Sequence, residues 1–141
     1  MPHEDHKGKP ESRRAVVAED EEMLRAILAE TLRCEGFLVN EACDGAEALA
    51  IIRSEPCTDL LVSDIRMPVV SGYQLVEAAL KLRPGLKVVL MTGHALDEAP
   101  PTLRPHRLPV LQKPFDLDQF AMLARELVGL PTGSDSNVSA T

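Results

Sequence analysis

The sequence predicts an α/β fold, a doubly wound parallel sheet of five strands with helices on both faces. Short apolar runs of strand length alternate with amphipathic stretches of helical period along the middle of the chain. Strict alternation of this kind implies a parallel sheet, because each right-handed crossover between parallel strands needs a helix to cover it. With 141 residues the chain is long enough for one domain with a proper core and too short for two ordinary ones.

Five apolar runs are the predicted strands. The first is Ala15-Val16-Val17-Ala18, which stops at acidic residues, as a buried parallel strand does at its carboxyl end. The third, residues 60–63, delivers Asp64 at its end. The remaining three cover residues 37–42, 87–91 and 110–112.

The helices are predicted from the 3.6-residue period and from capping residues, and they cover residues 21–35, 46–53, 73–82 and 117–128. The first ends at Gly36, and its apolar stripe consists of Met23, Leu24, Ile27, Leu28 and Leu32. Asp44, with Glu47 three residues later, predicts a capped start for the second helix, and Asp116 caps the last. The inner face of the last helix is predicted to hold Phe120, Leu123, Leu127 and Val128.

One segment breaks the alternation. Three prolines lie between His94 and Leu108, at positions 100, 101 and 105. Proline removes a backbone donor and forces the preceding residue out of helical geometry. A helix that covers this crossover is therefore predicted to be shortened or disordered.

Composition sets the limits of the domain and excludes several functions. Residues 1–12 and 131–141 are predicted to be disordered tails around an ordered domain at 13–130, because neither end can bury enough apolar area to fold. The net charge of −7 and the lack of a basic stripe argue against nucleic-acid binding. No apolar stretch suits a signal peptide or a bilayer span, so we expect a cytoplasmic protein without a membrane partner. Three cysteines without C-x-x-C spacing predict reduced thiols.

Polar side chains stand at the carboxyl ends of the predicted strands, where a doubly wound sheet binds its ligands. They are Glu19 and Asp20 after the first strand, Asp64 after the third, Thr92 after the fourth and Lys113 after the fifth. Taken singly, each of these residues is more often a solvated helix start, a turn residue or an exposed lysine. Only their common position at one edge of the sheet favours a site.

This set of groups suits phosphoryl chemistry with a divalent cation. Clustered carboxylates repel one another unless a cation lies among them, and hard oxygen ligands suit Mg²⁺. Asp20 and Asp64 are the predicted direct ligands, and Glu19 is predicted to reach the ion directly or through water. Asp64 would attack phosphorus as a nucleophile while Lys113 and Mg²⁺ neutralise the phosphoryl oxygens. Thr92 can donate its hydroxyl hydrogen to one of those oxygens.

Together the motifs resemble the receiver domains of two-component signalling. They are Glu19-Asp20, the run Asp64-Ile65-Arg66-Met67-Pro68 with Gly72, Thr92, and Lys113-Pro114-Phe115. The resemblance implies a flavodoxin-like fold that takes phosphate from a histidine kinase or a histidine phosphotransfer protein and signals to a downstream protein target. It also implies that Arg66 contributes its backbone carbonyl to the metal, and that the Met-Pro pair and Gly72 shape the loop after the third strand.

The chain departs from the family pattern at two places. Val110 stands where receivers usually carry the aromatic residue that turns inward on phosphorylation, and Glu19 stands where aspartate is commoner. The Thr92-Gly93 pair is similar to a subset of receivers with a weak fourth helix. We therefore expect phosphorylation to change the order and position of residues 93–108, which with the last helix would form the partner-binding face.

Two other functions are weighed against a phosphoacceptor. A phosphatase of the haloacid dehalogenase type needs a second acid two residues after its nucleophile, and this chain has Arg66 there and no length for a cap domain. The retained acidic, threonine and lysine positions speak against a scaffold or adaptor that keeps the fold without phosphorylation, but Val110 and the broken fourth helix leave this alternative open. If the chain is a phosphoacceptor, we expect no enzyme activity beyond its own phosphorylation and dephosphorylation.

Overall fold

The computed structural model describes residues 13–93, 103, 106 and 108–130. Their order is β1 (Arg14–Ala18), α2 (Glu22–Cys34), β2 (Leu38–Ala42), α3 (Gly45–Ser54), β3 (Thr58–Asp64), α4 (Gly72–Leu82), β4 (Lys87–Thr92), β5 (Val110–Gln112) and α5 (Leu117–Leu127). The five strands form one parallel sheet in the order β2-β1-β3-β4-β5. This confirms the predicted fold class, since the strand order reverses between β1 and β3 as in a doubly wound sheet.

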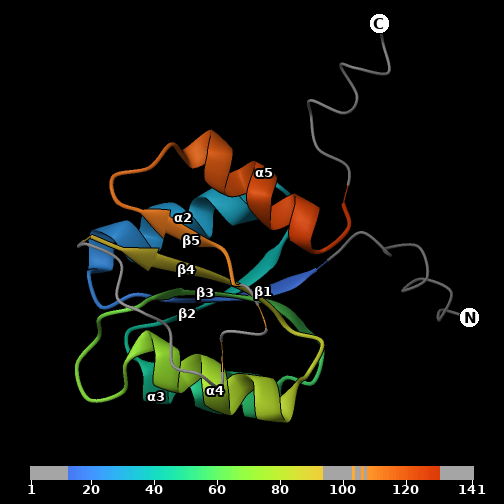
Figure 1. Ribbon diagram of the computed structural model, residues 1–141. Coiled ribbons are helices and arrows are strands. Elements are labelled where there is room, and N and C mark those ends of the chain that lie inside the picture. The colour runs from blue at the N-terminus through green and yellow to red at the C-terminus, as the bar shows by residue number, and fades with distance from the viewer. Residues whose placement is uncertain (1–12, 94–102, 104–105, 107, 131–141) are drawn as a thin grey trace, which may run out of the picture.

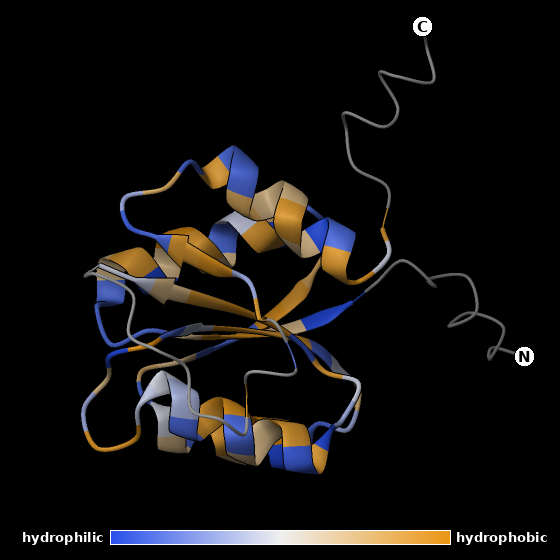
Figure 2. Cartoon of the chain, viewed as in Figure 1, coloured by the Kyte–Doolittle hydropathy of each residue, from blue (hydrophilic) through white to orange (hydrophobic). Residues whose placement is uncertain are grey.

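Helices cover both faces of the sheet. Figure 1 shows α2 and α5 on one side and α3 and α4 on the other. The central strands are largely apolar on both faces, as Figure 2 shows by their colour. In β1, for example, Ala15 and Val17 belong to the core under α2 and α5, whereas Val16 and Ala18 belong to the core under α3 and α4. Two hydrophobic cores therefore fix the sheet from both sides, and the carboxyl ends of its strands share one edge.

The predicted caps are present. The Asp44 carboxylate accepts a hydrogen bond from the Glu47 amide at 2.8 Å, and Asp116 accepts one from the Asp118 amide at 2.8 Å. A capping box that was not predicted begins α4, where Ser71 and Gln74 exchange side-chain hydrogen bonds with each other's backbone amides. These caps satisfy amides that the first helical turn leaves unpaired.

Two predictions about α2 and β3 are wrong in detail. Met23 and Ile27 are 72% and 45% exposed, because the buried stripe of α2 consists of Leu28, Ala29 and Leu32. The third strand was predicted to begin at residue 60, but β3 already begins at Thr58 and includes Asp59. The pairing of β1 with β3 is irregular at this point, and the Asp59 carboxylate accepts a hydrogen bond from the Arg14 amide at 3.0 Å.

Some predictions concern parts of the chain outside the described residues. These are the two disordered tails at 1–12 and 131–141 and most of the proline-rich segment between β4 and β5 that was predicted to weaken a helix. The three cysteines lie in the described part and are free and exposed. Among the described residues, no helix is both long enough and apolar enough to cross a bilayer.

Candidate functional site

The site lies at the carboxyl edge of the sheet, and each of its side chains comes from the end of a strand. Glu19 directly follows β1, Asp64 is the last residue of β3, and Thr92 is the last residue of β4. All three are buried, with Glu19 only 1% exposed, whereas the neighbouring Asp20 is exposed. Lys113 directly follows β5, and its amide donates to the Thr92 carbonyl at 2.7 Å. The sheet thus brings residues from across the sequence to one place.

Three carboxylates meet at this edge. Glu19, Asp20 and Asp64 each offer an oxygen atom, and these atoms lie within 4.8 Å of one another. Like charges at such distances repel strongly unless a cation lies among them. The two carboxylates that follow β1 and the one that ends β3 present only hard oxygen donors, which Mg²⁺ prefers. Because Asp20 is exposed, the site also leaves room for the water molecules that Mg²⁺ usually keeps. The residues therefore fit a magnesium ion.

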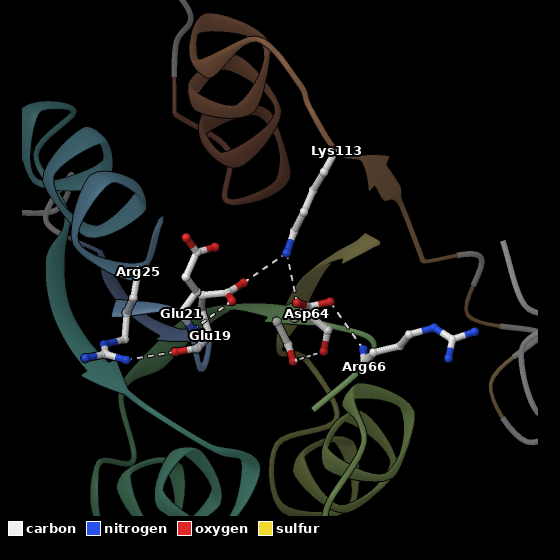
Figure 3. A network of polar contacts seen from close by, with 7 residues as sticks. Glu19, Glu21, Arg25, Asp64, Arg66 and Lys113 are labelled. Carbon is white, nitrogen blue, oxygen red and sulfur yellow. Dashed lines mark hydrogen bonds and ion pairs between the residues drawn. The ribbon is translucent and has the colours of Figure 1, made fainter. Parts of the chain in front are cut away.

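Lys113 connects two of these carboxylates. Its Nζ atom donates to Asp64 Oδ2 at 2.9 Å and to Glu19 Oε1 at 3.3 Å, as Figure 3 shows. Burial alone would lower the pKa of Lys113, but the hydrogen bond to Asp64 and the charges of Glu19 and Asp64 outweigh burial and raise it. The ammonium therefore stays charged and supplies a fixed cation beside the Asp64 carboxylate.

Glu19 is held at both of its carboxylate oxygens. Oε1 accepts from Lys113, and Oε2 accepts from the Glu21 amide at 3.0 Å. Burial raises the pKa of this carboxyl, and the hydrogen bond from the Glu21 amide and the charge of Lys113 oppose the rise without cancelling it. The ionised form of Glu19 is thus disfavoured mainly by burial and to a smaller degree by the charge of Asp64, and a bound cation would favour it.

The loop after β3 holds Asp64 from the other side. The Arg66 amide donates to Asp64 Oδ1 at 3.2 Å, and in Figure 3 the Arg66 side chain extends away from the carboxylates. The Ile65 amide donates to the Met91 carbonyl of β4 at 2.8 Å. Both oxygens of Asp64 are therefore fixed, Oδ1 by the loop and Oδ2 by Lys113, which leaves the carboxylate pre-organised for one direction of approach.

Gly72 lies against the same turn. A Cβ atom at this position would stand 2.8 Å from the Ile65 Cα and closer still to the Asp64 carbonyl oxygen. The Gly72 amide also donates to the Ile65 carbonyl at 2.7 Å. The sequence suggested that Gly72 shapes the loop after the third strand, and the reason is this close approach of the first residue of α4 to the end of β3.

Comparison with known proteins identifies the family. The model of the response regulator receiver domain family matches residues 15–125. The chain belongs to this family. Among the relatives of this receiver domain is the response regulator receiver protein CpdR of Brucella abortus, 35% identical over 106 residues that cover 74% of this chain and 88% of CpdR. The crystal structure of the receiver domain of the hybrid histidine kinase CckA superposes with a TM-score of 0.70 at 30% identity, and covers 82% of this chain and 98% of that domain.

Other relatives are much longer than this receiver domain. The DNA-binding transcriptional regulator NtrC of Escherichia coli is 33% identical over 113 residues, which cover 79% of this chain but only 24% of NtrC. Family membership makes the chain a phosphoacceptor module of two-component signalling. The phosphatase and adaptor alternatives are not favoured. The prediction that the chain avoids nucleic acid finds no support in relatives that are named as DNA-binding, and it stays a prediction.

The structure places all six predicted site residues at this edge, and their roles stay predictions. Sequence reasoning missed the amides of Glu21 and Arg66, which hold the two carboxylates, because a backbone donor has no residue type by which to recognise it. It also missed Arg25, whose Nη1 atom donates to the Glu19 carbonyl at 2.9 Å. The available signal was that Arg25 is the first basic residue after the four acidic residues at positions 19–22.

Proposed function

We propose that Asp64 is the phosphorylated residue of this receiver domain. The observation that carries the proposal is the Lys113 ammonium, which donates to Asp64 Oδ2 at 2.9 Å while the Arg66 amide holds Oδ1 at 3.2 Å. Asp64 is buried and is the last residue of β3. Within the described part of the chain, it is the only member of the acidic cluster that contacts both Lys113 and the β3–α4 loop.

In the proposed reaction, a carboxylate oxygen of Asp64 attacks the phosphorus of a phosphohistidine on a kinase or a histidine phosphotransfer protein. An O–P bond forms, the N–P bond breaks, and the departing imidazole keeps the electron pair and takes a proton. Lys113 pairs with the phosphoryl oxygens, and Thr92 donates its hydroxyl hydrogen to one of them. The enzyme-like action of the chain is confined to its own phosphorylation and dephosphorylation.

Glu19, Asp20, Asp64 and the backbone carbonyl of Arg66 would hold the magnesium ion of this site. When bound, Mg²⁺ neutralises charge on the transferring phosphoryl group. It would also compensate the negative charge of the three carboxylates, each of which offers an oxygen within 4.8 Å of the others. We expect Mg²⁺ to bind before phosphate, so millimolar Mg²⁺ should raise the temperature of thermal unfolding, and Asp20→Ala should remove the rise. An unchanged unfolding temperature in the wild type would argue against a metal site.

Labelling with acetyl phosphate and Mg²⁺, followed by intact mass spectrometry, tests the phosphoacceptor directly. The wild type should gain one phosphoryl group per chain, and Asp64→Asn should gain none while it keeps its fold. Asp59→Asn is the matched control, because it alters a carboxylate near the amino-terminal end of β3, at the edge of the sheet opposite the site. Persistent labelling of Asp64→Asn would refute the assignment, and a wild type without any labelling would favour the adaptor. Turnover of a chromogenic phosphate ester would instead indicate a phosphatase.

The partners proposed beyond the family are a histidine kinase or phosphotransfer protein as donor and a downstream protein as target. Output through protein contacts, without nucleic acid or membrane, is part of the same proposal, as are a cytoplasmic location and an ordered domain at 13–130. The net charge of −7 supports the choice of protein over nucleic acid as the direct target. A shift of DNA mobility with the isolated chain at low salt would contradict it.

A further inference from the structure

Arg25 lies one turn into α2, and its guanidinium reaches back to the corner between β1 and α2. Its Nη1 atom donates to the Glu19 carbonyl oxygen at 2.9 Å, and its Nε atom pairs with Glu41 Oε1 of β2 at 3.5 Å. The side chain is only 17% exposed. Figure 3 shows the guanidinium beside the Glu19 backbone, on the side opposite Lys113. Arg25 therefore contacts the backbone of the site and none of its carboxylates.

The carbonyl that Arg25 holds belongs to the peptide that joins Glu19 to Asp20. On the other side of Glu19, the amide donates to the Ala42 carbonyl of β2 at 3.1 Å. The Glu19 side chain is fixed by Lys113 and the Glu21 amide. Asp20 follows directly and is exposed, so the direction in which its side chain leaves the backbone depends on the orientation of this one peptide.

We propose that Arg25 is a positioning residue of the metal site, which orients the Glu19–Asp20 peptide so that both carboxylates face the bound cation. The inference rests on the proposed function of this site. A guanidinium suits the task because its planar, rigid fork can bond a carbonyl and a carboxylate at once. Residues behind the ligands of a metal site commonly change its affinity by 10–100-fold when they are lost.

Neighbouring Arg33 separates this role from simple charge pairing. Arg33 Nη1 also pairs with Glu41, at 3.3 Å from Oε2, but its Nη2 atom donates to the Val39 carbonyl in β2, at 3.1 Å, and not to the β1–α2 corner. Loss of either arginine removes one positive charge and one contact to Glu41. Only loss of Arg25 releases the Glu19 carbonyl.

The sign of the effect distinguishes positioning from electrostatics. Removal of a positive charge near a cation site favours the cation, so a purely electrostatic role predicts tighter Mg²⁺ binding in Arg25→Gln. A positioning role predicts weaker binding, by on the order of tenfold. The experiment follows thermal unfolding of the full chain by circular dichroism against Mg²⁺ concentration, and compares Arg25→Gln, Arg25→Lys and Arg33→Gln with the wild type.

We expect Arg25→Gln to need about tenfold more Mg²⁺ for the same relative rise in unfolding temperature. Labelling by acetyl phosphate should return to the wild-type extent at saturating Mg²⁺, and Arg33→Gln should titrate like the wild type. Arg25→Lys keeps the charge but not the fork, so it should also bind more weakly, and it serves if Arg25→Gln does not fold. The inference would be overturned if both Arg25 variants responded to Mg²⁺ at the same concentrations as the wild type. It would also be overturned if Arg33→Gln lost as much Mg²⁺ affinity as the Arg25 variants. A wild type without any Mg²⁺ response would instead refute the metal site itself, and the inference with it.

Discussion

A substitution at Gly72 tests how tightly the start of α4 fixes the phosphoacceptor. In Gly72→Ala the new Cβ would lie 2.8 Å from the Ile65 Cα and also too close to the Asp64 carbonyl oxygen. Both neighbours are backbone atoms, so the end of β3 and the start of α4 must move apart. Overpacking of this kind costs about 1–3 kcal/mol. The lower conformational entropy of alanine in the unfolded chain returns roughly 0.4–1 kcal/mol, so that the middle of each range leaves a net loss of about 1–2 kcal/mol.

The assay combines urea unfolding with labelling of Asp64 by acetyl phosphate. The free energy of unfolding should fall by about 1–2 kcal/mol. The rate of labelling should also fall, because a shift of about 1 Å in a reacting group can cost on the order of a hundredfold. Gly85→Ala is the matched control, since nothing lies within 4 Å of a Cβ at this position. Equal stability and equal labelling rates in the two variants would refute the claim that Gly72 fixes Asp64.

Three other predictions concern strain, protonation and signalling. Val69 is 96% exposed and has a φ of +68°, which a β-branched residue rarely adopts. Asparagine adopts this conformation more easily, so Val69→Asn should raise the free energy of unfolding in urea titrations by about 1 kcal/mol. A lower free energy of unfolding in the variant would show that the turn is not strained. Burial raises the pKa of Glu19 above 4.5, so in the absence of metal the folded wild type loses stability as the pH rises from 4.5 through the raised pKa. Glu19→Gln lacks this titration, so with a chelator present its free energy of unfolding should rise relative to that of the wild type over the same pH range. A difference between the two proteins that does not change with pH would contradict this. Beryllofluoride with Mg²⁺ should change hydrogen exchange mainly in residues 93–108, and constant protection there with a change elsewhere would refute that switch.

Local signals explain why most of the fold could be predicted. The strand β5 has the predicted bounds, and the Asp44 cap follows from a pattern of four adjacent positions. The start of β3 could not be predicted, because it depends on contacts with β1, where Arg14 pairs with Thr58 and its amide donates to the Asp59 carboxylate 45 residues later in the chain. Periodicity likewise does not say which members of an apolar stripe face the sheet. Met23 and Ile27 follow the helical period of α2, yet both are exposed.

The site was predictable to the extent that it depends on topology. In a parallel sheet the carboxyl ends of all strands share one edge, so acidic residues after the first and third apolar runs and a lysine after the last must lie near one another. The supporting contacts depend on geometry that no such rule supplies. The fork from Arg25 to the Glu19 carbonyl and the approach of Gly72 to β3 each join segments whose distance is set only by packing.

Lys113 bridges Asp64 and Glu19, so phosphorylation of Asp64 should change the contacts of both carboxylates. Its ammonium now pairs with Asp64 and Glu19, and its amide is bonded to the Thr92 carbonyl at 2.7 Å. A phosphoryl group adds roughly 1.5 to 2 negative charges at Asp64 and competes for the same ammonium. Any shift of Lys113 toward the phosphoryl oxygens therefore loosens its contact with Glu19 and pulls on the ends of β4 and β5 together. Position 110 holds valine and no aromatic ring, so no large side chain there can take up this movement. We infer that the movement passes instead through the backbone hydrogen bond between Lys113 and Thr92.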